Sequence, residues 1–301
     1  MNRDFETWSS AREGAAVGPV EHKGLVRVAG RSRLDFLHRM STQKLRGLEP
    51  GAVAHLAFLN VKGHVLAEGL AVVRAEDVLL SVESPAEPLR AHLARYIVMD
   101  DVKLEDVSAA FGVVPVLGNR GVALGRERGS GITAWPNPRR GVPSLDLLLV
   151  ASEAGAFREA LLATGAVPLT REDLEGLRVQ AGLPRFGVEI DESRLPMEAG
   201  LVPSAISLDK GCYLGQEVVL RGTFRGQIQK GLVQLALPAA AGPGAILTSE
   251  GREVGVLTSV AETPAGRLGL GYLRRAHWRV GEKIATAGGE AEVRRVLVEE
   301  R

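Results

Sequence analysis

The sequence predicts an α+β body spanning residues 1–225, followed by a small all-β module spanning residues 226–301. A chain of 301 residues with 45% hydrophobic side chains is long enough to build two or three separate cores. Strand-like and helix-like stretches alternate through the first part. From about Lys230 onward, short strand-like segments follow one another between turns that contain Gly or Pro. That spacing is typical of a small β-barrel or sandwich.

The body begins with a strand, a helix and a hairpin. The stretch GLVRVAG (24–30) alternates like a strand and ends in a glycine turn, and RSRLDFLHRM (31–40) follows as a helix with apolar residues every third position. Two strands, at 52–59 and 65–73, flank the sequence NVKGH. Asn and Gly between two apolar runs predict a hairpin turn there.

Three helices and two strands are expected in the rest of the body. The stretch PAEPLRAHLARYIV predicts a helix with Tyr96 and Ile97 on its apolar stripe, and FGVVPVLG and SLDLLLVA read as strands. A helix is expected to begin at Ser152, a favourable N-cap residue. Another opens at TREDLEGLRVQAG, where Thr170 and Asp173 approximate a capping box. The β module is predicted from four segments: KGLVQLAL, REVGVLTSVA, RLGLGYLRR and EAEVRRVLVEE.

Charge and composition exclude several classes of protein. The chain carries 37 basic and 36 acidic side chains, without the basic excess of a nucleic-acid binder. No apolar stretch approaches the ~20 residues that a membrane helix needs, and the start MNRDFETWSS lacks the apolar region of a secretory signal. One cysteine excludes an intrachain disulfide and fits a reducing compartment, so we expect a cytoplasmic protein.

Most cofactor and catalytic fingerprints are absent from the sequence. The six histidines are scattered, and no Cys/His cluster predicts zinc. There is no phosphate-binding Walker loop, no dinucleotide-binding glycine motif after a strand and no serine-hydrolase elbow. An iron–sulfur cluster is usually held by four thiolates, so a chain with one cysteine cannot carry a cluster alone.

The single cysteine, Cys212, lies in a polar segment, KGCYLGQEVVLRGTFRGQ. A free cysteine is more often a small buried hydrophobic residue than a reactive group. Here Gly211 and Gly215 bracket the thiol and permit a tight backbone. Lys210 and Arg221 are cations of the kind that favour a reactive thiolate.

The same segment offers groups that suit a polar ligand. Gln216 and Glu217 carry an amide and a carboxylate that can orient a heterocycle. Between Lys210 and Lys230 the chain has four cations and one anion. Such a run is either a solvated face or a site for a ligand that carries carboxylates. The pattern as a whole favours a functional cysteine.

The string KGCYLGQEVVLR resembles the signature of the folate-binding YgfZ family, relatives of the aminomethyltransferase (T-protein) of the glycine cleavage system. The family motif Lys-Gly-Cys-(Phe/Tyr)-x-Gly-Gln-Glu is matched by Lys210, Gly211, Cys212, Tyr213, Gly215, Gln216 and Glu217. The likeness extends over most of the chain, through GLVRVAGRSRLDFLHRMST, NVKGHV, RYIVMDDVKLED, LRVQAGLPRFGVEI and LGLGYLRRAHWRVGEKI.

This resemblance implies a three-lobed aminomethyltransferase-like ring of two interleaved α+β lobes and a C-terminal β-barrel, with tetrahydrofolate as cofactor. It implies an accessory protein for iron–sulfur cluster assembly or repair, with Cys212 as the working group. The expected partners are a reduced folate and iron–sulfur client enzymes or assembly proteins. The residues expected to bind folate are the motif residues together with Arg221, Gln180, Asp101 and Lys62.

Other interpretations stay open at this point. Many relatives have Glu where this chain has Gln180, which is equally well a helix-surface residue. Asp101 fits a solvated turn, and Lys62 fits an exposed hairpin lysine. The alternative function is a folate-dependent aminomethyltransferase-type enzyme, with Asp101 near the attacking nitrogen. A third alternative is a scaffold that kept the fold without the ligand.

Overall fold

The computed structural model describes residues 3–224 and 228–298. Its contacts divide the chain into two compact units, each assembled from three segments. Unit 1 contains residues 1–33, 47–53 and 70–181, and unit 2 contains residues 34–46, 54–69 and 182–301. The boundary predicted between residues 225 and 226 lies outside the described residues and stays a prediction.

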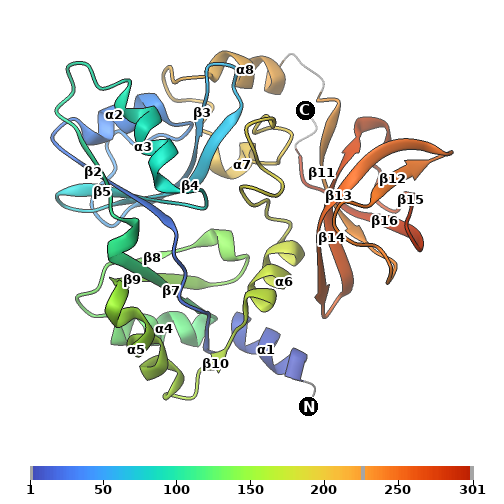
Figure 1. Cartoon of the computed structure of the whole chain (residues 1–301), viewed down its shortest axis with the longest axis horizontal. Coiled ribbons are helices and arrows are strands. Elements are labelled where there is room, and N and C mark those ends of the chain that lie inside the picture. Colours follow the sequence, from blue (N-terminus) through green and yellow to red (C-terminus); the bar gives the residue numbers. More distant parts are fainter. Residues whose placement is uncertain (1–2, 225–227, 299–301) are drawn as a thin grey trace. The chain divides into compact units, whose positions relative to one another are not determined.

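Unit 1 contains a five-stranded sheet with the strand order β10-β1-β7-β9-β8. Its long strands β7 (Phe111–Leu117) and β9 (Ser144–Val150) form where the apolar runs predicted strands, and they pair antiparallel. Helices α4 (Asn119–Arg128) and α5 (Ala151–Leu162) pack on one face of this sheet (Figure 1). The shorter strands are β1 (Ala16–Val17), β8 (Ala134–Pro136) and β10 (Val167–Pro168).

A second five-stranded sheet has the order β3-β4-β5-β2-β6. Its strands are β2 (Gly24–Ala29), β3 (Val53–Leu59), β4 (Val65–Val73), β5 (Asp77–Val82) and β6 (Lys103–Asp106). In unit 1, Leu25 of β2 and Leu79 of β5 share a core with Trp135, which is fully buried. The predicted hairpin between β3 and β4 is confirmed, because Asn60 N donates to His64 O at 2.9 Å and Gly63 has φ +78°.

The helices beside these sheets confirm some predicted ends and correct others. Helix α2 (Arg33–Met40) forms where expected, and α3 spans Ala86–Ala94. The prediction that Tyr96 and Ile97 continue α3 is wrong: both are half-buried and lie beyond its last residue. Their N–H groups donate to carbonyls three residues back, which makes a tight final turn. The adjacent β-branched residues Ile97 and Val98 disfavour helix.

Two predicted helix starts had different outcomes. Helix α5 begins directly after strand β9, with Val150 as its N-cap, so the prediction that Ser152 caps it is wrong. Helix α6 (Arg171–Ala181) has the predicted capping box. Thr170 N donates to Asp173 Oδ2 at 2.7 Å, and Asp173 N donates to Thr170 Oγ1 at 3.1 Å. Helix α1 (Arg3–Arg12) was not predicted from the sequence.

The C-terminal part of unit 2 is a closed six-stranded β-barrel with the order β11-β14-β13-β12-β15-β16. The sequence left a barrel and a sandwich open for this module, and the structure shows a closed barrel. Trp278 is buried in its core, and its indole Nε1 donates to Leu273 O at 2.9 Å. The strands are β11 (Lys230–Ala236), β12 (Ile246–Ser249), β13 (Arg252–Thr263), β14 (Gly266–Arg274), β15 (Lys283–Thr286) and β16 (Gly289–Val296).

Unit 2 also contains the short helix α7 (Val202–Ala205) and helix α8 (Gln216–Phe224). A core formed by β3, β4, α7, α8 and the loop after Gly182 holds these elements together. Among the helices of residues 3–224 and 228–298, none is both long and apolar enough to span a membrane.

Candidate functional site

The cysteine segment is the loop between α7 and α8, and its backbone is fastened to the end of α2. Ser207 N donates to Thr42 O at 3.0 Å, and Leu214 N donates to Arg39 O at 3.3 Å. The Thr42 hydroxyl donates to Ala205 O at 2.6 Å. Both ends of the loop are therefore held by the residues that follow or close α2.

Lys210 is buried, with 7% of its surface exposed, and its ammonium group lies among backbone carbonyls at the C-terminal end of α2. Nζ donates to Ser41 O at 2.6 Å, to Gln43 O at 3.0 Å and, at a shorter distance, to His38 O. Carbonyls beyond the last helical turn need donors, and a cation is favoured at this end of the helix dipole. Burial lowers the pKa of Lys210 to about 7.

The neighbour of that ammonium on α2 is an uncharged imidazole. His38 Nδ1 accepts hydrogen bonds from Leu45 N at 3.2 Å and Arg46 N at 3.3 Å, so this nitrogen carries no proton. Burial and, next, the Lys210 ammonium lower the pKa of His38. His38 thus shapes the turn whose carbonyls receive Lys210.

Cys212 is a free and exposed cysteine. Gly211 before it is also exposed, and a Cβ there would meet nothing within 4 Å. Gly215, on the other side, has φ +81°, and a Cβ would lie 2.7 Å from Asn60 O. The second glycine is therefore required for the loop to approach the β3–β4 hairpin, whereas the first is not needed for space.

Tyr213 is buried, and the half-buried Gln216 folds back onto the turn that leads into α8. Tyr213 is 7% exposed, and its ring centroid lies 4.8 Å from Lys210 Nζ. Within the described part of the chain its hydroxyl has no hydrogen-bond partner, and burial raises its pKa to about 12. The Gln216 side chain accepts from Tyr213 N at 3.3 Å, so that amide oxygen is used by the loop itself.

Glu217 and Arg221 lie on the exposed side of α8. Arg221 Nη2 and Glu217 Oε1 are 2.6 Å apart, with side chains 71% and 83% exposed. An exposed pair of this kind contributes on the order of 0–1 kcal/mol, so a ligand carboxylate can displace it at little cost. Arg225, counted among the local cations, lies outside the described residues.

Three further predicted folate residues lie in different units. Lys62 is exposed on the β3–β4 hairpin of unit 2, and a Cβ on the next residue, Gly63, would meet Val218 of α8 at 2.8 Å. The structure thus brings the Lys62 turn beside the cysteine segment. Asp101 belongs to unit 1, where Arg31 pairs with it at 2.7 Å and lowers its pKa. Gln180 also belongs to unit 1, at the end of α6.

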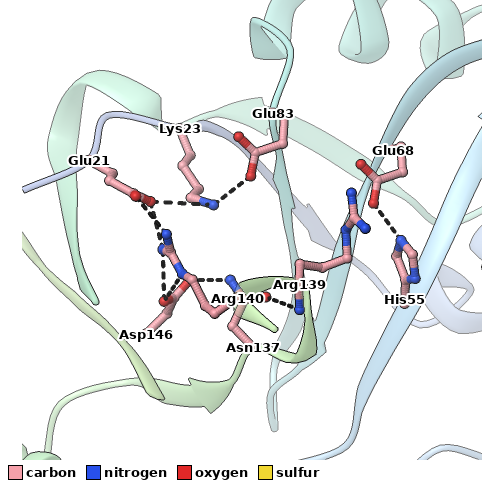
Figure 2. A network of polar contacts seen from close by, with 9 residues as sticks. All are labelled: Glu21, Lys23, His55, Glu68, Glu83, Asn137, Arg139, Arg140 and Asp146. Atoms are coloured by element: carbon pink, nitrogen blue, oxygen red, sulfur yellow. Dashed lines mark hydrogen bonds and ion pairs between the residues drawn. The ribbon is translucent and has the colours of Figure 1, made fainter. Parts of the chain in front are cut away.

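Sequence reasoning missed an ionic network in unit 1, in which the Asp146 side chain is fully buried and the Arg140 side chain is 9% exposed (Figure 2). The Arg140 guanidinium contacts Glu21 through two bonds, of 2.6 and 2.7 Å, and Asp146 at 2.9 Å. Lys23 Nζ lies 2.7 Å from Glu83 and 3.5 Å from Glu21. Burial alone would raise the pKa of Glu21, but Arg140 and Lys23 lower it to about 2. The signal in the sequence that could have predicted this network was Asp146, a charged residue inside the apolar strand SLDLLLV.

Unit 2 contains two further buried carboxylates that were not predicted. Glu68 on β4 is hydrogen-bonded to the imidazole of His55 on β3, and both are buried (Figure 2). Glu189 accepts from Ser259 Oγ at 2.5 Å and from Thr258 Oγ1 at 2.8 Å, which ties the loop after α6 to β13. These carboxylates stabilise the fold through satisfied hydrogen bonds. No group of three or more His, Cys, Asp or Glu in the described ranges is arranged to hold a metal ion.

Known proteins resemble this chain in both its fold and its barrel. A family model described as the CAF17 C-terminal β-barrel domain matches residues 229–298. A chloroplastic Arabidopsis thaliana protein that carries the name of a transferase is 28% identical over 94% of this chain and 71% of its own length. An aminomethyltransferase of Geobacillus kaustophilus is 28% identical over 96% of this chain and 85% of its own.

A solved structure agrees with these matches. The glycine cleavage system aminomethyltransferase T from Bartonella henselae superposes with a TM-score of 0.86 at 20% identity, covering 98% of this chain and 90% of that one. At this identity the likeness establishes the fold. The two α+β sheets and the closed barrel confirm the predicted fold class. The chain therefore has the aminomethyltransferase fold and carries a CAF17-type C-terminal β-barrel domain.

Proposed function

We propose that this chain is a folate-binding protein of the YgfZ family that assists iron–sulfur cluster assembly or repair in client enzymes through Cys212. The observation that carries the proposal is the exposed thiol. It stands on a loop in which Lys210 and Tyr213 are buried, so the thiol is the nucleophile that the motif presents to a partner. The aminomethyltransferase fold and the CAF17-type barrel support a folate-related role.

The residues of unit 2 fit the acidic tail of a folate. Arg221 and Lys62 are exposed cations, one on α8 and one on the hairpin beside it. A glutamate tail carries carboxylates that such cations bind through charge-assisted hydrogen bonds. The Tyr213 hydroxyl, which has no partner within the described residues, is a further group that a ligand can satisfy. Bound tetrahydrofolate supplies the capacity to carry a one-carbon unit.

Calorimetric titration of the purified protein with tetrahydrofolate, under anaerobic reducing conditions, tests the folate part. We expect binding to the wild type and a loss of about tenfold in affinity for Arg221→Ala, because one charge-assisted contact is removed. Arg252→Ala, at an exposed position of the barrel, is the matched control and should bind normally. An absence of binding by the wild type would overturn the folate assignment.

Gene deletion with complementation tests the iron–sulfur part. The deletion strain is complemented with the wild type or with Cys212→Ser, and iron–sulfur dehydratase activity is measured in extracts. The proposal expects lower activity in the deletion strain and rescue by the wild type alone. Full rescue by Cys212→Ser would show that the thiol is a bystander, and unchanged activity on deletion would remove the iron–sulfur role.

The second candidate is a folate-dependent aminomethyltransferase-type enzyme, which is favoured by relatives at 28% identity that are named aminomethyltransferases. Transfer of a one-carbon unit to folate needs no thiol on the enzyme. Formation of methylenetetrahydrofolate from an aminomethyl donor, retained by Cys212→Ser, would establish this function. The cytoplasmic location predicted from the sequence stays a prediction, and one relative is chloroplastic by name.

A further inference from the structure

Lys210 and Cys212 are two residues apart, yet their side chains have opposite environments. Lys210 is buried among three carbonyls, whereas Cys212 is exposed. An ammonium group has three N–H donors, and here each has an acceptor. No donor is left over for a hydrogen bond to a thiolate at position 212, so the donors of this ammonium group serve the loop and not the thiol.

The three acceptors come from one short stretch of unit 2. His38 O lies in the last turn of α2, and the carbonyls of Ser41 and Gln43 follow it. Replacing the ammonium by an apolar group would leave the carbonyls of His38 and Ser41 without this charged donor. Loss of a charged hydrogen bond from a buried acceptor is costly, so the contact strongly constrains the local structure. The lysine thus joins the middle of the cysteine loop to a rigid helix end.

The rest of the loop is consistent with a fixed backbone. Leu214 N and Ser207 N are bonded to the residues around α2, and the Tyr213 ring packs over the ammonium at 4.8 Å. Gly215 is held against Asn60 O. Fastened on both sides, position 212 has little freedom except in its own side chain.

We infer that Lys210 is a positioning residue, whose ammonium group tethers the loop to the C-terminal end of α2 and thereby fixes where the Cys212 thiol is presented. This inference rests on the proposed function, in which Cys212 is the working group. In this inference Lys210 has a structural role in the motif, and Cys212 is the residue that reacts. A partner that reacts with the thiol would therefore find it in one orientation. Because the loop is already ordered, binding would not carry the entropic cost of ordering it.

The test compares Lys210→Met with the matched control Lys44→Met, an exposed lysine in the stretch that follows α2. Two measurements are made on each folded protein: hydrogen exchange of the 207–215 amides, and the rate of Cys212 alkylation by iodoacetamide against pH. For Lys210→Met we expect exchange about tenfold faster or more in this loop, with the midpoint of the alkylation profile unchanged. Lys44→Met should match the wild type in both.

Two outcomes would overturn the inference. A higher alkylation midpoint with unchanged exchange would make Lys210 an electrostatic activator of the thiol. A lower melting temperature with both profiles unchanged would make it an ordinary core residue. Neither measurement depends on folate binding or on iron–sulfur activity, so a failure of the tether is distinguishable from a failure of the proposed function.

A second measurement does not require Lys210→Met to fold. A neutral lysine has two N–H donors for three carbonyls, so deprotonation should loosen the same loop. Burial lowers the pKa of Lys210 to about 7. In a Cys212→Ser background, loop protection corrected for intrinsic exchange should therefore fall as pH rises from about 7 toward 10. Protection that stays constant across the pH range in which Lys210 itself is measured to lose its proton would contradict the tether.

The titratable and charged neighbours do not mimic this change. The pKa of His38 is lowered by burial and by Lys210, so His38 is already neutral above pH 7. Burial raises the pKa of Tyr213 to about 12, above the range of the experiment. The other nearby cations are Arg39 and Lys44, and the Lys44→Met variant measures the contribution of Lys44.

Discussion

The ionic network of unit 1 makes a quantitative prediction about acid stability. Glu21 has an ordinary pKa of 4.5 and, beside Arg140 and Lys23, a pKa of about 2 in the folded protein. A carboxyl with a lowered folded pKa stabilises the native state above its unfolded pKa, and that contribution is lost as pH falls through the folded value. At ~1.4 kcal/mol per pH unit, the difference amounts to about 3 kcal/mol at neutral pH.

The variant Glu21→Gln removes the charge at nearly constant size. We expect it to lower the free energy of unfolding by about 3 kcal/mol at pH 7, because Arg140 keeps Asp146 but loses its two-bond partner. At pH 3.5 the difference from the wild type should shrink to about 2 kcal/mol, and it should continue to fall toward pH 2.

Urea denaturation, monitored through the hydrogen exchange of the β7 and β9 amides, measures this difference in the free energy of unfolding for unit 1 itself. Glu49→Gln is the matched control, because Glu49 is exposed in the same unit, and it should change stability by less than ~0.5 kcal/mol at every pH. A difference between Glu21→Gln and the wild type that is equally large at pH 7 and pH 3 would refute the electrostatic argument. The effect would then come from packing alone.

Three further substitutions test the geometry of unit 2 by chemical denaturation. Tyr213→Phe should stabilise the protein by about 1 kcal/mol, because it removes a buried hydroxyl without a partner in the described residues, and a loss of stability would reveal a partner. Gly215→Ala should cost clearly more than Gly187→Ala, since both glycines have φ +81° but only the first would place its Cβ against a backbone atom, Asn60 O at 2.7 Å. Equal losses would show that conformation alone matters there. Glu250→Asn should stabilise the barrel by about 0.5 kcal/mol, because Glu250 has φ +50° in a two-residue hairpin loop, and no gain would contradict that reasoning.

Local sequence patterns predicted much of the fold. An alternating run predicted β2, apolar runs predicted β7 and β9, and the capping box of Thr170 and Asp173 predicted the start of α6. These features depend on neighbours within a few residues, so they are encoded locally. Helix α3 was extended too far because its end depends on the turn that leads into β6.

The candidate site was found from the sequence, but the roles of its side chains were not. The motif identified Cys212 and its neighbours as a unit, and its charges indicated that Lys210 is a cation of the kind that favours a thiolate. The tertiary structure instead directs that lysine to carbonyls 167–172 residues earlier in the chain. Which acceptor a long, flexible side chain reaches is decided by the packing around it, and no local pattern encodes that packing.

By itself, the sequence determined the α+β body, the β module and the segment that carries the single cysteine. Only the tertiary structure decided that the module closes into a barrel and that Arg140 gathers carboxylates from distant segments. It also decided that Lys210 is internal while Cys212 is exposed. The physical reason is the same in each case. Closure, buried ion pairs and side-chain direction depend on contacts between residues far apart in the chain, whereas periodicity, capping and composition depend on residues close together.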